Sequence, residues 1–231
     1  MNVLLLRLSG VLQAWGTQSH FGVRDTGQEP SKSGVFGLLY AALGYRRDVP
    51  LDEDWAELRM GVRVDQEGTV LRDFHTAGID GIRSTDGQKV LTKYPVLSNR
   101  YYLADARFLV GLEGPDLDLL RRLHEALQAP VWPLYLGRKS CVPGEPVWLR
   151  DGLRPATGLR AALTNYPWLG CDPGPAPDRL RLIIEGEEGV AVRPDQPLSF
   201  SERRFAPRRV MTTFVPTPET EMEDSLCTSP D

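Results

Sequence analysis

The sequence predicts an α+β fold, and three observations support this prediction. An apolar stretch that ends before Gly10 is typical of a buried strand over residues 2–9. Two helices are expected, at residues 35–43 and 115–127, the second with leucines at helical spacing. Short strand-like segments follow each helix, and an insertion lies between the two halves. The order strand–helix–strand–insertion–strand–helix–strand is the ferredoxin-like βαββαβ plan, in which two helices cover one face of an antiparallel sheet.

The first half of the chain supplies a strand, a loop, a helix and a second strand. Residues 10–30 carry four glycines and no apolar period, so a loop is expected there. Residues 31–34 open the first helix, which should end at Gly44 because glycine ends many helices. Residues 55–64 end in the alternation that is typical of a half-buried strand.

The insertion covers residues 72–102 and mixes turn formers with basic and aromatic residues. It has no pattern that would build a core, so we expect a long extension in the form of an irregular hairpin. Strand character returns over residues 101–112.

Beyond the second helix, residues 131–136 are expected to form the last strand of the plan. A basic loop bounded by glycines follows at 137–144, and a proline-rich linker lies at 173–177. Two further short strands are expected at 179–185 and 209–215.

These elements predict three parts of the chain. Residues 1–144 form a ferredoxin-like domain, and residues 145–217 a small β-rich part packed on it. Residues 218–231 form an acidic tail, which composition marks as disordered.

Composition excludes several classes of protein. The chain has 231 residues, of which 41% are hydrophobic and 25% charged, enough for a substantial core without disulfides or metals. The apolar run at residues 3–6 is interrupted at Arg7, no apolar run approaches the length of a membrane span, and no signal peptide is expected. Three widely spaced cysteines without a Cys-x-x-Cys pair fit a reducing cytosol. We therefore expect a cytoplasmic protein without a membrane contact.

The net charge of -4 is unevenly distributed. Residues 219–231 hold five acids and no Lys or Arg, so the rest of the chain has 27 basic and 26 acidic residues. Basic pairs recur in this body, and local patches decide whether a polyanion can dock.

The sequence contains few motifs that would indicate an enzyme. The three histidines, at positions 20, 75 and 124, lie in none of the common metal-binding spacings, and no nucleophile or phosphate-binding motif is present. We expect no metal and no cofactor. His124 is expected to be a surface or edge residue of the second helix. A metal-free ribonuclease could still use His20 or His75 as general acid or base, so this alternative stays open.

Two polar loops suit phosphate. Residues 31–34 (Ser-Lys-Ser-Gly) present hydroxyls, an ammonium and free backbone N–H groups at a helix N-terminus, although an ordinary serine cap explains them equally well. Residues 137–140 (Gly-Arg-Lys-Ser) form either a basic RNA contact or a solvated turn. A pure protein-interaction module would not need both loops.

Aromatic residues in the first loop and in the insertion also allow either a structural or an RNA-binding interpretation. Trp15, two residues after Gln13, is either buried beneath the first loop or free to stack on a base. The insertion also sets aromatic residues beside arginines, which single-stranded RNA binding would use.

Four stretches, in order along the chain, carry a resemblance to a known family. They are residues 8–16, 30–39, 72–76 and 135–141. They resemble the CasD (Cas-five) family of the type I-E CRISPR surveillance complex Cascade, within the RAMP superfamily, and the resemblance runs from about residue 2 to residue 215.

The resemblance implies a specific function. Members have an RRM-type ferredoxin-like domain with a long β-hairpin thumb, here residues 72–102, and bind the 5′ repeat-derived handle of the CRISPR RNA (crRNA). The implied partners are the crRNA, the backbone subunit beside the thumb and the large subunit, with target DNA reached only indirectly. A related subtype cuts the precursor RNA with a Tyr–Lys–His set. Tyr45, Lys93 and His75 are present here without an adjacent Lys-His pair, which favours a non-catalytic subunit over a metal-independent endoribonuclease.

Fourteen residues are candidates for RNA binding, and none is a candidate for catalysis. They come from the first loop, the first helix and the turn after it, the thumb and the basic loop: Gln13, Trp15, Arg24, Lys32, Ser33, Gly34, Arg46, His75, Arg100, Tyr101, Gly137, Arg138, Lys139 and Ser140.

Overall fold

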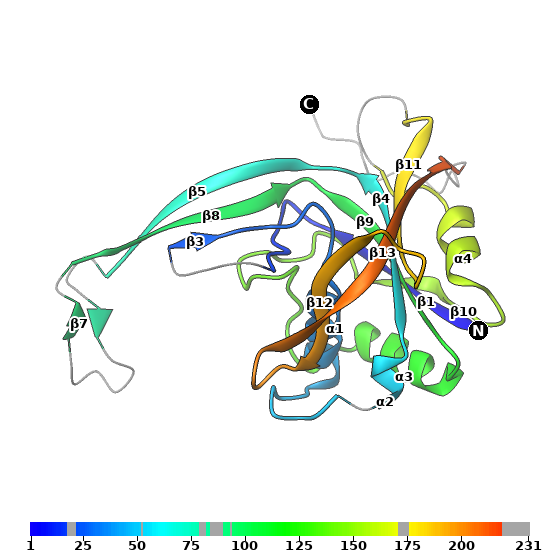
Figure 1. The fold of residues 1–231 in the computed structure, drawn as a ribbon, viewed down its shortest axis with the longest axis horizontal. Helices are drawn as coiled ribbons and strands as arrows, with labels where there is room; N and C mark the ends of the chain where they lie inside the picture. Colours follow the sequence, from blue (N-terminus) through cyan, green and yellow to red (C-terminus); the bar gives the residue numbers. More distant parts are fainter. Residues whose placement is uncertain are drawn as a thin grey trace.

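A computed structural model describes residues 1–17, 22–51, 53–78, 82–83, 90–92, 94–170 and 176–218. Its centre is a seven-stranded sheet in the order β10-β1-β9-β4-β11-β13-β12, in which each strand runs antiparallel to its neighbours (Figure 1). The strands are β1 (Asn2–Ser9), β4 (Arg59–Gln66), β9 (Arg107–Gly114), β10 (Trp148–Arg154), β11 (Arg179–Glu185), β12 (Ala191–Ser199) and β13 (Arg204–Pro216). The predicted mixed α+β class, with mostly antiparallel strands and few helices, is confirmed.

Helices cover both faces of this sheet. On one face, α1 (Lys32–Leu43) and α3 (Leu117–Gln128) share an apolar cluster with Leu4 and Leu6 of β1. The short helix α2 (Glu53–Ala56) lies on the same face, where Trp55 joins this cluster. On the other face, α4 (Leu159–Asn165) shares a cluster with the alternate residues of β1. Because both faces are covered, β1 is buried along nearly its whole length.

The α4 face depends on two glycines. Gly61 and Gly111 are cross-strand partners on β4 and β9. A Cβ atom on either would lie 2.6 or 2.7 Å from a leucine side chain of α4, so the missing side chains let the helix approach the sheet closely.

We expect Gly111→Val to lower the free energy of unfolding by about 1–3 kcal/mol, because α4 would have to move away from the sheet. Urea denaturation measures this change. The control is Gly37→Ala in α1, where a Cβ meets no atom within 4 Å and alanine favours a helix by about 0.5–1 kcal/mol. Equal stability of the Gly111→Val variant and the wild type would contradict the close packing of α4.

Most of the expected elements are observed, with differences in extent and burial. The strand expected at 55–64 begins only at Arg59, because residues 53–56 form α2. The strands at 2–9 and 179–185 and both helices are present, and the strand expected at 209–215 is the second half of β13. Residues 101–112 contain parts of two strands rather than one. Strand β4 is buried on both faces instead of one.

The strand predicted at 131–136 is wrong, because this segment has no strand structure. Pro133 removes a backbone donor from it, and Pro130 directly precedes it. β10 instead pairs with the free edge of β1.

The C-terminal elements lie in the same sheet as β1. α4 and β12 were not expected from the sequence, and β12 contains two prolines at the edge of the sheet, where they are tolerated. The division at residue 144 stays a prediction. The tail beyond residue 218 and most of the linker at 173–177 lie outside the described residues. No helix in the described part of the chain is long and apolar enough to cross a membrane.

Candidate nucleic-acid interface

A long hairpin arm extends from the sheet (Figure 1). Its strands are β5 (Thr69–Ala77) and β8 (Val96–Ala104), which pair antiparallel over nine positions. Near the tip, β6 (Ile82–Arg83) pairs with β7 (Val90–Thr92). The expected hairpin is therefore observed. It is regular where β5 pairs with β8, and its root starts three residues before the predicted insertion.

The register gives the arm two different faces. In an antiparallel pair, directly opposed residues point to the same side. Arg72 opposes Tyr101 and Phe74 opposes Asn99, so one face is aromatic and partly apolar. The intervening pairs, Asp73 with Arg100 and His75 with Ser98, make the other face polar. We call these the aromatic face and the polar face of the arm.

The first loop adds a second arginine to the polar face. β2 (Leu12–Gln13) and β3 (Val23–Arg24) pair with the edge of β8 that β5 leaves free. In this register Arg24 opposes Arg100, and among the described residues neither forms an ion pair. Like charges directly opposite one another destabilise a sheet. A bound anion would offset this repulsion, so the two arginines favour an anionic ligand.

Arg138 fastens the basic loop to the root of the arm. Its guanidinium donates to the carbonyl oxygens of Tyr101 at 3.1 Å, Arg24 at 2.9 Å and Asp25 at 3.0 Å, and lies 4.7 Å from the ring centre of Tyr102. These contacts commit most of its donors to the protein itself. The geometry makes Arg138 a positioning residue for the loop more than a free phosphate ligand.

The rest of the basic loop is held close to the first loop. Gly137 has φ +93, and a Cβ there would lie 1.8 Å from the carbonyl oxygen of Ala14, so only glycine fits. Lys139 and Ser140 are exposed at the surface, and Lys139 has no ion pair or hydrogen bond with the described residues. Next to them, burial raises the pKa of the Cys141 thiol.

Gln13 and Trp15 lie beneath the surface instead of lining it. Gln13 is fully buried; its amide donates to the carbonyl oxygens of Leu8 and Ala106 at 3.2 and 2.7 Å and accepts from the Trp15 indole at 2.9 Å. Trp15 is 1% exposed, and a Cβ on Gly34 would lie 2.9 Å from its ring. The expected contact of these side chains with RNA is not available in this conformation, because both are enclosed and fully partnered.

The phosphate site expected at the start of α1 is filled by the protein itself. Ser31 caps the helix, and a carboxylate oxygen of Asp195 accepts from the backbone N–H of Lys32 at 2.8 Å. The carboxylate of Asp195, on β12, therefore takes the place at the helix N-terminus that was expected for a phosphate. Ser33 and Gly34 are half-buried in this first turn.

Lys32 is 1% exposed and lies 3.0 Å from both carboxylate oxygens of Glu185. Burial lowers the pKa of its ammonium, against the opposing effect of Glu185. Arg208 joins the same group through Asp195 at 2.7 Å. Lys32 is therefore part of a buried ion network and does not face a ligand, contrary to its expected role.

We expect Lys32→Met to lower the free energy of unfolding by about 3 kcal/mol, because it leaves a carboxylate in the buried network without its ammonium. The salt dependence of RNA binding should not change. The matched control is Lys139→Met, which removes an exposed ammonium. It should leave stability unaltered and reduce the salt slope by about 0.7 for one lost phosphate contact. A reduced salt slope for Lys32→Met would show that Lys32 does reach RNA.

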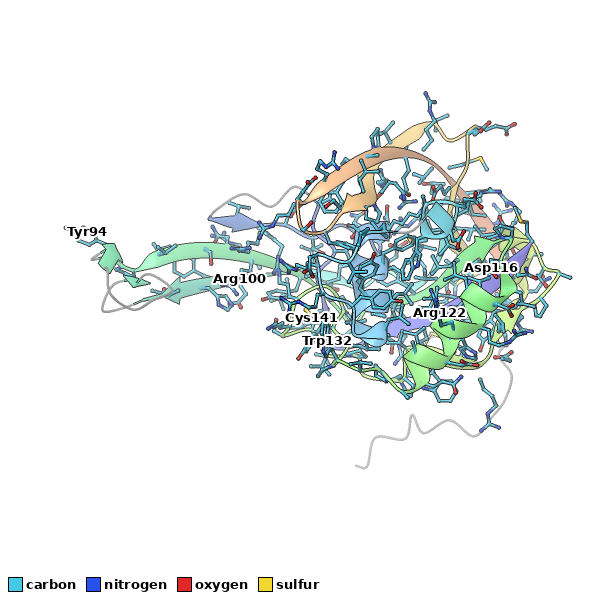
Figure 2. The ribbon with its side chains drawn as sticks, turned by 90° about the horizontal axis from the view of Figure 1, so that it is seen from below. Tyr94, Arg100, Asp116, Arg122, Trp132 and Cys141 are labelled. Carbon is cyan, nitrogen blue, oxygen red and sulfur yellow. The ribbon has the colours of Figure 1, made fainter. Side chains whose placement is uncertain are left out.

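The remaining candidates fall into two groups. His75, Arg100 and Tyr101 belong to the arm, and Figure 2 shows Arg100 nearer to the body than Tyr94. Arg46 lies on the turn after α1 and pairs only with Asp48, at 3.6 Å, among the described residues. The structure brings Arg24, His75, Arg100 and the basic loop together, and leaves Arg46 apart from them.

Sequence reasoning missed the residues that divide the arm into two faces. Asn99 accepts from the Arg72 guanidinium at 3.0 and 2.9 Å on the aromatic face, and Ser98 accepts from Arg100 at 3.4 Å on the polar face. Phe74 is 57% exposed beside the first of these pairs. The alternation of residues 72–75 is the signal that could have separated the faces.

Two of the three histidines lie in the described part of the chain. Nε2 of His75 contacts a carboxylate oxygen of Asp73. His124 is buried and its Nε2 lies 2.9 Å from the carbonyl oxygen of Leu149, which corrects its expected surface position. His20 and Lys93 lie outside the described residues. Within the described part of the chain, no cluster of three His, Cys, Asp or Glu residues could hold a metal ion.

Several known proteins resemble this chain in sequence, and two solved structures also resemble it in fold. A family model described as "CRISPR-associated protein (Cas_Cas5)" matches residues 3–211. The "CRISPR system Cascade subunit CasD" of Escherichia coli (strain K12) is 34% identical over 223 residues, covering 89% of this chain and 92% of that protein. A solved structure described as "Crystal structure of Cas protein" is 48% identical, covers 94% of this chain and 98% of its own, and has a TM-score of 0.74. A chain of a "CRISPR RNA-guided surveillance complex" is 35% identical, with coverage of 94% and 91% and a TM-score of 0.73.

Proposed function

The chain belongs to the family of CRISPR-associated Cas5 proteins, and on that premise we propose that it is a non-catalytic, RNA-binding subunit of a Cascade-type surveillance complex. Its ligand is the 5′ repeat-derived handle of the crRNA, in the service of crRNA-guided DNA targeting for antiviral defence. The observation that carries this proposal is the polar face of the arm, where Arg24 and Arg100 lie in register beside the exposed end of the basic loop.

The two faces of the arm suit different parts of a nucleotide. Arg24, Arg100 and Lys139 supply cations for handle phosphates, while the exposed rings of Phe74 and Tyr94 offer stacking surfaces for unpaired bases. Phosphate contacts supply most of the affinity, and splayed bases supply discrimination. The loops that carry these groups are held in place by hydrogen bonds of Gln13, Trp15 and Arg138.

The strand order supports the finer fold assignment. The strands β10-β1-β9-β4 lie in the order fourth, first, third, second of a βαββαβ unit, with α1 and α3 on one face. This is the order expected for an RRM-type ferredoxin-like domain carrying the arm as its thumb. In that assignment the subunit is cytoplasmic and of subtype I-E. It contacts a backbone subunit beside the thumb and the large subunit, and it meets target DNA only through the complex.

A metal-independent endoribonuclease is the second candidate, because His75 and Asp73 form a histidine–carboxylate pair on the polar face. We expect the purified chain to bind repeat RNA without cutting it, with or without a chelator. His75→Ala should then alter affinity at most. A true general acid or base contributes about 10²–10⁴-fold, which single-turnover assays detect easily. Specific cutting at the handle boundary that His75→Ala abolishes would overturn the non-catalytic assignment.

A further inference from the structure

Five consecutive apolar residues are exposed between α3 and the basic loop. They are Ala129, Pro130, Val131, Trp132 and Pro133. Val131 is 65% exposed and Trp132 is 42% exposed. An exposed apolar run of this length commonly marks an interaction site.

The run is held rigidly on the end of α1. The backbone N–H groups of Val131 and Trp132 donate to the carbonyl oxygens of Ala42 at 2.9 Å and Ala41 at 3.1 Å. Gly44 ends the helix with φ +71, and a Cβ there would lie 2.7 Å from the Val131 side chain. Because these contacts fix the backbone, the apolar side chains are presented without the entropic cost of ordering a loop. Trp132 is labelled in Figure 2.

Two arginines follow the end of α1 that holds the apolar run. Arg46 and Arg47 are exposed on the turn that follows Gly44, and the Arg46 side chain is 80% exposed. Its ion pair with Asp48, at 3.6 Å between largely exposed groups, is weak. Among the described residues Arg47 has no ion pair or hydrogen bond. The surface therefore has an apolar centre and a basic rim.

We propose that residues 129–133, together with Arg46 and Arg47, form a docking surface for a neighbouring protein subunit. The occupant is a segment with apolar side chains for Val131 and Trp132 and an acidic group for the arginines. This inference rests on the proposed function, since it requires that the chain works within a multi-subunit complex. Tryptophan and arginine are the residues most enriched among interface hot spots.

The composition of the surface favours protein over nucleic acid. Only Trp132 offers a π face, whereas the other four residues of the run are aliphatic or proline. Apolar side chains ringed by charged ones are the usual anatomy of a protein–protein interface. A base would find one stacking partner here and few hydrogen-bonding groups.

The test uses the whole complex, reconstituted by coexpression of its subunits with crRNA. Trp132→Ser should weaken retention of this chain about tenfold or more in a dilution series followed by native mass spectrometry. Val190→Ser is the matched control, because Val190 is 91% exposed on the turn before β12 and lies outside the surface. The handle affinity of the isolated variant should equal that of the wild type. If Trp132→Ser melts at a lower temperature, Val131→Ser replaces it.

Three results would overturn the inference. One is unchanged retention of the variants. Another is a crosslink between Trp132 and nucleic acid in the complex. The third is oxidative labelling of Trp132 that is blocked in the isolated full chain and restored when the chain ends at residue 218, since the acidic tail would then be the occupant. If the wild type itself binds no handle RNA, the proposed function fails instead, and the retention assay still decides whether this surface docks a protein.

Discussion

Replacing residues 73–99 by a short Gly/Ser link is expected to leave a folded body that binds handle RNA at least tenfold more weakly and assembles poorly. None of the described residues of this segment contributes a side chain to either apolar cluster, so the sheet and its helices keep their core. It does contain the partner of β3, because the N–H of Asn99 donates to the carbonyl oxygen of Gly22 at 2.8 Å. The change therefore removes His75 and the Phe74–Asn99 pair of the aromatic face, and it also releases Arg24 from its register with Arg100.

Thermal unfolding and RNA titration together measure this effect. The matched control replaces only residues 79–94, which leaves every β5–β8 pair from Thr69–Ala104 to Ala77–Val96 in place. The control should retain most of the affinity of the polar face. Loss of the cooperative unfolding transition in the 73–99 variant would show that the arm belongs to the core after all.

The double change Arg24→Ala and Arg100→Ala is also expected to weaken RNA binding strongly. Each arginine that contacts a phosphate contributes a charge-assisted hydrogen bond, so affinity should fall about tenfold for each. For two lost contacts to a single strand, the slope of log K against log salt should become shallower by about 1.4.

A control that removes the same number of charges distinguishes direct contact with RNA from an effect of net charge. Arg150 and Arg179 are exposed arginines on β10 and β11, away from the arm, and neither forms an ion pair with the described residues. Their double change to alanine should alter the salt slope little. Equal effects of the two double variants would mean that the arm attracts RNA only through the overall charge of the body.

Much of the fold could be predicted from local pattern. The strands at 2–9 and 179–185 are apolar stretches with clear bounds, and the helix of residues 117–128 has leucines at helical spacing after an aspartate cap. Residues 131–136 were misread because a short apolar run between turns is typical of a strand wherever it lies. Pro133 within the run argues against a strand, but the attachment of the run to α1 leaves no mark on the sequence pattern.

The candidate site was harder to predict, because burial depends on partners far away in the sequence. Lys32 was expected to hold phosphate, yet the residue that neutralises it is Glu185, 153 positions later. The sequence pattern at the helix start is the same whether the anion is a phosphate or the carboxylate of Asp195. Arg24 and Arg100 were proposed as RNA contacts, but only the strand register brings them opposite each other.

The most direct test of the account is ultraviolet crosslinking of this subunit to RNA within the assembled complex, followed by mapping of the crosslinked nucleotides and peptides. The account predicts that the nucleotides fall in the repeat-derived 5′ handle of the crRNA, at one uniform end. It also predicts that the peptides contain Arg24, Arg100 or Lys139. Crosslinks spread along the guide, or peptides confined to other parts of the chain, would contradict handle binding by the polar face of the arm.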